Sequence, residues 1–150
     1  MRNIKILAII PYEGLRDNML KAAKSYENVS MQVVVGTMEL GLKYAKEAEK
    51  ADYDIIISRG GTAETIEEYV SLPVVHIPVS VFDYVQIIEK AGKTDKPTAI
   101  IGYANVTEDA YHIKAVAKSN IDIFTIMDPK EIIPLLEKLK SDGYQLIVGD

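Results

Sequence analysis

The chain has 150 residues, which is enough for one ordinary domain or for two small lobes. Hydrophobic residues make up 48% and charged residues 26%, a globular mixture that excludes disordered and low-complexity chains. A net charge of −5 argues against direct nucleic-acid binding, and the absence of cysteine excludes disulfides, thiolate nucleophiles and cysteine-based metal sites. No apolar run approaches the ~18 residues of a membrane span, and the N-terminus does not resemble a signal peptide, so we expect a cytoplasmic protein.

Short apolar runs rich in isoleucine and valine punctuate the chain and predict strands that are buried on both faces. These runs are Ile4–Ile10, Val29–Val35, Asp54–Ser58, Val74–Ile77, Thr98–Gly102, Ile121–Ile126 and Gln145–Val148. Between them lie segments with apolar residues at helical spacing. Such strict alternation predicts an α/β protein with mainly parallel sheets and right-handed crossovers.

Several residues mark expected helix ends. Thr62 is expected to precede one helix, and Asp128 followed by Pro129 is typical of an N-cap and first helical position. Gly92 and Gly143 stand where two helices are expected to end.

The polar stretch 92–97 predicts either a plain loop or a hinge between lobes, and we favour the hinge. The expected division is then residues 1–92 for the first lobe and 93–150 for the second. The strand Gln145–Val148 is followed by Gly149 and Asp150, which are typical of the turn into a further helix. We therefore expect the second lobe to be truncated at the C-terminus.

In open α/β sheets, ligands bind outside the carboxyl ends of the strands. The third predicted strand is followed by four residues that begin a helix, Arg59, Gly60, Gly61 and Thr62. The two glycines permit close backbone approach, the amides of residues 61–63 would point outward at the positive helix end, and an arginine suits a carboxylate or phosphate. This pattern favours an anion pocket, and the alternative is a tight turn with a surface arginine.

Ser80 and Asp83 resemble a capping box in which aspartate replaces the usual glutamate. Either they only cap a helix, or they also form a second wall of the pocket. His76 lies mid-strand and is interpreted as a satisfied core histidine rather than a ligand or base.

Tyr103 and Asn105 follow the fifth predicted strand and offer hydrogen-bond donors, although asparagine is equally a favoured turn residue. The amides of Gly149 and Asp150 are candidates for the same cleft.

Other chemistries lack support in the sequence. The two histidines, His76 and His112, have no metal-ligand spacing, and no G-x-S-x-G elbow occurs, so we expect neither a metal nor a cofactor. A phospho-receiver domain is also disfavoured, because the third predicted strand ends in Ser58 and Arg59, where that domain needs an acceptor aspartate.

The stretch I-I-S-R-G-G-T-A at 56–63, followed by L-P-V-V-H-I-P-V-S at 72–80 and Asp83, resembles the N-terminal sensor domain of the propionate catabolism activator family. Members of that family are sigma-54-dependent transcriptional activators. The resemblance covers most of the chain and depends mainly on residues 55–91. It implies two Rossmann-like lobes in a chelatase-like arrangement, with a ligand cleft between them.

The resemblance also implies a small carboxylate ligand such as 2-methylcitrate. Carried over by motif or by loop position, the ligand-binding residues are Arg59, Gly60, Gly61, Thr62, Ser80, Asp83, Tyr103, Asn105, Gly149 and Asp150. In the family, an AAA+ ATPase domain and a helix-turn-helix follow the sensor. This chain contains no Walker A motif, so nucleotide hydrolysis and DNA binding are expected outside it.

The resulting hypothesis is a non-enzymatic sensor that binds a carboxylate and controls a downstream ATPase domain. Two alternatives remain open: an enzyme on a two-lobed α/β scaffold that acts on a carboxylated substrate, and a protein-interaction module with an incidental anion pocket. The sequence leaves open whether the chain forms a homo-oligomer.

Overall fold

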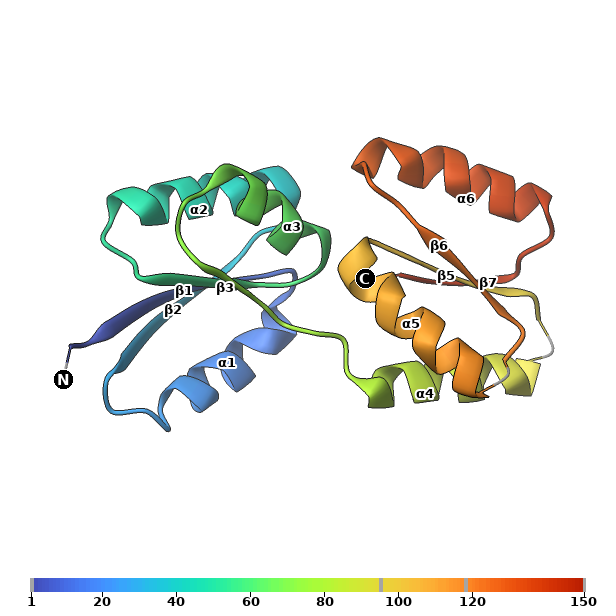
Figure 1. Cartoon of the computed structure of the whole chain (residues 1–150), viewed down its shortest axis with the longest axis horizontal. Helices are drawn as coiled ribbons and strands as arrows, with labels where there is room; N and C mark the ends of the chain where they lie inside the picture. Colours follow the sequence, from blue (N-terminus) through green and yellow to red (C-terminus); the bar gives the residue numbers. More distant parts are fainter. Residues whose placement is uncertain (1, 95, 118, 150) are drawn as a thin grey trace. The chain divides into compact units, whose positions relative to one another are not determined.

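The structure is a computed structural model and describes residues 2–94, 96–117 and 119–149. The chain divides into two compact units, Met1–Ile77 and Pro78–Asp150 (Figure 1). Each unit is an α/β layer structure around its own parallel sheet. In the described part of the chain, no helix combines the length and apolar character needed to span a bilayer.

Unit 1 contains a four-stranded parallel sheet in the order β2-β1-β3-β4. Its elements are β1 (Ile4–Ile10), η1 (Glu13–Leu15), α1 (Arg16–Ala23), β2 (Val29–Val35), α2 (Met38–Lys50), β3 (Ile55–Ser58), α3 (Gly60–Tyr69) and β4 (Val74–His76). Helices α2 and α3 cover one face of the sheet and α1 covers the other (Figure 1).

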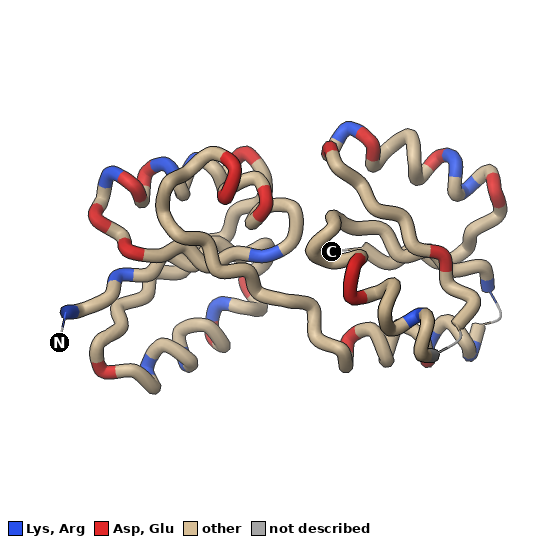
Figure 2. The backbone as a smooth tube through the Cα atoms, in the orientation of Figure 1, with Lys and Arg blue, Asp and Glu red and all other residues tan. Residues whose placement is uncertain are grey.

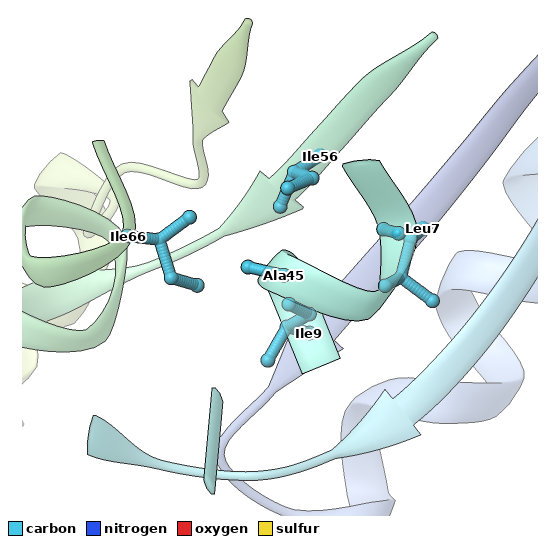
Figure 3. Close-up of a cluster of buried hydrophobic side chains, with 6 residues drawn as sticks. Leu7, Ile9, Ala45, Ile56 and Ile66 are labelled. Carbon is cyan, nitrogen blue, oxygen red and sulfur yellow. The ribbon is translucent and has the colours of Figure 1, made fainter. Parts of the chain in front are cut away.

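The core of unit 1 explains why the sequence of strand β1 is apolar at successive positions and does not alternate with polar residues. Ile9 packs with Leu7, Ile56, Ala45 of α2 and Ile66 of α3 (Figure 3). The next residue of the strand, Ile10, packs into a separate cluster on the α1 face. Successive side chains of a strand point to opposite faces, so a strand covered on both sides must be apolar throughout.

Unit 2 contains a three-stranded parallel sheet in the order β6-β5-β7. Its elements are α4 (Val81–Thr94), β5 (Thr98–Gly102), α5 (Ala104–Ala117), β6 (Ile121–Thr125), η2 (Pro129–Glu131), α6 (Ile132–Ser141) and β7 (Leu146–Gly149). Helices α4 and α5 pack on one face and α6 packs on the other (Figure 1). Every residue of the central strand β5 is buried.

The predicted α/β fold class with mainly parallel sheets is confirmed, and all seven predicted strands form. The expected lobe boundary at residues 92 and 93 lies inside α4. The structural division falls instead between Ile77 and Pro78, because Tyr84 and Ala91 of α4 pack into the core of unit 2.

The predicted helix ends are partly confirmed. Asp128 accepts a hydrogen bond from the Lys130 amide within a capping box, and Gly143 adopts a φ of +88° after α6. Two predictions are wrong. Thr62 does not precede α3, which begins two residues earlier, and Gly92 does not end α4, which continues to Thr94. Glycine is only weakly unfavourable in a helix, so packing of the surrounding residues overrides it.

Candidate functional site

The predicted anion loop lies where β3 passes directly into α3. A single residue, Arg59, separates the last residue of the strand from the first of the helix. Arg59 is extended, with φ of −145° and ψ of 165°, and its carbonyl oxygen accepts the first helical hydrogen bond, from the Ala63 amide at 3.2 Å. Arg59 is therefore the backbone N-cap of α3, and its side chain makes no capping hydrogen bond.

Gly60 makes this abrupt transition possible. Its φ of +56° lies in the left-handed region, which glycine adopts without steric cost. Gly61 is buried, and its carbonyl oxygen accepts a hydrogen bond from the Thr65 hydroxyl at 2.8 Å. The first turn of α3 contains no acidic side chain, so no carboxylate of that turn neutralises the positive end of the helix dipole.

Thr62 is engaged in the contact between α2 and α3. Its Oγ1 accepts a hydrogen bond from the Met38 amide at 3.0 Å, and only 8% of the residue is exposed. Met38 is the first residue of α2. The Thr62 hydroxyl, predicted to contact a ligand, therefore satisfies an amide at the start of the neighbouring helix.

Two features of this region were missed by sequence reasoning. Ser58 is fully buried, and its Oγ has no hydrogen-bond partner among the described residues. It lies two residues after Ile56 on the strand face that α2 and α3 cover, immediately before Arg59. The signal available in the sequence was a serine at a position where strand alternation calls for a buried apolar side chain. Met38, with a φ of +46°, carries no such signal.

Ser80 and Asp83 lie in unit 2 and form the cap of α4. The Asp83 carboxylate accepts hydrogen bonds from the Ser80 amide at 3.1 Å and from the Ser80 hydroxyl at 2.7 Å. The Ser80 hydroxyl in turn accepts from the Asp83 amide at 3.2 Å. The capping interpretation is confirmed, and a ligand role for this pair stays a prediction.

Tyr103 and Asn105 flank the start of α5 in unit 2. The Tyr103 carbonyl oxygen accepts hydrogen bonds from the amides of Val106 and Thr107. The Tyr103 ring packs against the buried hydrophobic cluster on the face of the sheet that α6 covers. Asn105 is the second residue of α5 and is partly buried. Gly149 ends β7 and is exposed, whereas Asp150 lies outside the described residues.

The structure thus brings Arg59, Gly60, Gly61 and Thr62 together at the start of α3 in unit 1. The remaining described candidates belong to unit 2. The expectation that both groups line one cleft stays a prediction. A separate hollow of about 710 Å³ in unit 2 lies along β6, and none of the predicted ligand residues lines it.

His76 is less buried than predicted. It lies on the edge strand β4, its side chain is 29% exposed, and its Nε2 lies 3.0 Å from Glu67 Oε2 of α3. Among the described residues, no group of three or more histidine, aspartate or glutamate side chains is placed to hold a metal ion.

Two parallel-sheet units, with a glycine-rich helix start at the carboxyl edge of the first, define a two-lobed α/β domain of the Rossmann type. The family model described as propionate catabolism activator matches residues 25–150. The chain belongs to this family, and it is a regulatory N-terminal domain of a sigma-54-dependent activator.

One solved structure agrees with this assignment, and a second agrees with the fold alone. An NtrC family transcriptional regulator from Clostridium acetobutylicum is 27% identical with a TM-score of 0.80, and the match covers 97% of this chain and 76% of that chain. The ABC domain in complex with L-Trp from Streptococcus pneumonia is 12% identical with a TM-score of 0.50, covering 99% of this chain and 65% of that one, and it supports the fold alone. No match is found among curated proteins.

Proposed function

We propose that this domain senses a small carboxylate, which it binds at the start of α3 in unit 1. The observation that carries the proposal is the placement of Arg59 directly before Gly60, at the carboxyl edge of a parallel sheet. Ligands of open α/β sheets bind at this edge. The proposed ligand class is a di- or tricarboxylate such as 2-methylcitrate.

The start of α3 has the chemistry that an anion requires. The first amides of a helix have no carbonyl partner within that helix and carry the positive end of its dipole. Gly60 and Gly61 have no side chains, so a carboxylate oxygen can approach the backbone closely. The guanidinium of Arg59 presents two parallel donors that match a carboxylate.

One neighbouring feature bears on the same location. Ser58, immediately before Arg59, is fully buried, and its hydroxyl has no hydrogen-bond partner among the described residues. The adjacent start of α2 adds little positive potential, because its first turn carries the acidic side chain of Glu39. Figure 2 shows acidic and basic residues interspersed along α2.

In the full-length activator, we propose that carboxylate binding controls a downstream AAA+ domain, with ATP and DNA bound outside this chain. A ligand shifts the equilibrium between two conformational states of the domain only to the extent that it binds one state more tightly than the other. The proposed location is the cytoplasm.

Isothermal titration calorimetry with 2-methylcitrate, citrate and propionate tests the proposal. One charge-assisted hydrogen bond is worth about 1.5–3 kcal/mol, so Arg59→Ala is expected to weaken binding at least tenfold. Arg2→Ala is the matched control, because it removes the same charge from an arginine that is 84% exposed and paired with Asp54. Its affinity should stay within about twofold of the wild type.

Three results would contradict the proposal. If the wild-type protein binds none of the carboxylates, it has no sensor site of this class. If Arg59→Ala leaves the affinity unchanged, Arg59 does not belong to the binding site. Stoichiometric conversion of the bound carboxylate to a product would instead favour the enzyme alternative.

A further inference from the structure

The starts of α2 and α3 are joined by a contact that we call the α2–α3 clamp, made of Met38, Gly41 and Thr62. Thr62 Oγ1 lies 3.0 Å from the Met38 amide nitrogen and 3.8 Å from the Met38 sulfur. The Thr62 methyl lies against Gly41. Thr62 is nearly buried, so both its hydroxyl and its methyl face α2.

Gly41 sets how closely the two helices approach. A Cβ added at Gly41 would lie 2.6 Å from Thr62 Cγ2, a separation that real Cβ atoms do not adopt. The same Cβ would lie 3.3 Å from the Gly36 carbonyl oxygen and 3.4 Å from Ile9 Cγ2, which are tight but tolerable contacts. The Thr62 methyl is therefore the one severe obstacle to a side chain at Gly41.

Met38 adopts a strained backbone conformation at this contact. Its φ of +46° is unfavourable for a residue with a side chain and persists where the surroundings over-determine it. At its other end α2 is also tied to the segment that follows α3, because Glu49 Oε1 accepts hydrogen bonds from the amide and the hydroxyl of Ser71 at 2.5 and 2.7 Å. Both ends of α3 are thereby held against α2.

We propose that Gly41 and Thr62 are positioning residues, which set where the first amides of α3 and the Arg59 side chain lie. The inference rests on the proposed carboxylate site and gives Thr62 a role different from direct ligand contact. Thr62 is the third residue of α3, so displacing it moves the Gly60 and Gly61 amides as well. In enzymes, a misplacement of about 1 Å can cost about a hundredfold in rate, and we expect the charged contacts of this site to depend on geometry in the same way.

The test is a double-mutant cycle on the whole chain, with citrate as the probe. Gly41→Ala is expected to weaken citrate binding at least tenfold. Thr62→Ser removes the obstructing methyl and keeps the hydroxyl, so it should bind within about threefold of the wild type. The double variant Gly41→Ala/Thr62→Ser should recover, on a logarithmic scale of Kd, at least half of the affinity that Gly41→Ala alone loses. A double variant that binds no better than Gly41→Ala overturns the inference.

A second pair of variants covers the case in which Gly41→Ala does not fold. Thr62→Val keeps the shape of threonine but cannot accept the hydrogen bond from the Met38 amide. The Thr62→Val protein should therefore bind citrate at least fivefold more weakly than the Thr62→Ser protein. Equal affinities of these two variants overturn the positioning role of the hydroxyl.

Amide NMR spectra of the ligand-free chain separate this inference from the proposed function. Gly41→Ala should shift the amide signals of Gly61 and Ala63, and the added Thr62→Ser change should return them toward their wild-type positions. Unmoved signals overturn the clamp whether or not any carboxylate binds. Restored signals together with a wild type that binds no citrate uphold the clamp and overturn the proposed ligand class alone.

Discussion

The hydroxyl of Tyr84 donates a hydrogen bond to the carbonyl oxygen of Val106, and both residues are buried in unit 2. The contact joins α4 to the first turn of α5 across 22 positions of sequence. It is one reason why α4 belongs to unit 2 although it precedes the polar stretch expected to separate the lobes.

Tyr84→Phe is expected to destabilise unit 2 by about 0.5–1.5 kcal/mol, because the change removes one buried hydrogen bond between α4 and α5. Urea unfolding followed by circular dichroism measures this loss. Tyr111→Phe is the matched control, since the Tyr111 hydroxyl also donates to a carbonyl oxygen, that of Ile123, but from a residue that is 50% exposed. Equal losses for the two variants would show that burial does not set the strength of these bonds.

Alanine substitutions at Gly143 and Gly92 should change the stability of the protein in opposite directions. Gly143→Ala is expected to cost about 1 kcal/mol, because Gly143 has a φ of +88° that a side chain disfavours. Gly92→Ala should stabilise by up to about 1 kcal/mol, since Gly92 lies in α4 with no atom within 4 Å of an added Cβ. Thermal unfolding of both variants provides the comparison. A destabilising Gly92→Ala would mean that α4 ends earlier than the structure places it.

Ile66→Ala tests the core that supports the candidate site. Ile66 is fully buried between α3 and the sheet, so removing its side chain is expected to cost about 2–5 kcal/mol. Ile133→Ala, at a residue that is 63% exposed, should change stability by less than about 0.5 kcal/mol. Denaturant titration of the two variants measures the contrast, and a small effect of Ile66→Ala would contradict the packing of α3 on this face.

Glu49 should contribute to the pH dependence of stability. Hydrogen bonds from the Ser71 hydroxyl and amide hold its pKa below the usual value of 4.5. A lowered folded-state pKa gives stability that is present above the unfolded pKa and lost as the pH falls through the folded one. Glu49→Gln should therefore flatten the fall in thermal stability below pH 4.5. A variant whose melting temperature falls with pH as steeply as that of the wild type would contradict the assignment.

Local patterns were sufficient for the strands and for several helix ends. β1 and β5 are covered on both faces, so their burial appears in the sequence as continuous apolar runs with few alternatives. Asp128 and Gly143 were recognisable for a similar reason, since a cap depends on residues within a few positions of one another.

The sequence by itself thus determined the α/β class, the order of strands and helices, and the glycine-rich start of α3 as the best anion-binding candidate. Only the tertiary structure decided that α4 packs in unit 2 and that the Thr62 hydroxyl bonds the Met38 amide 24 positions away. The physical reason is the range of the interactions. Periodicity and capping act over a few residues, whereas the partner of a buried polar group is selected by which distant elements pack together.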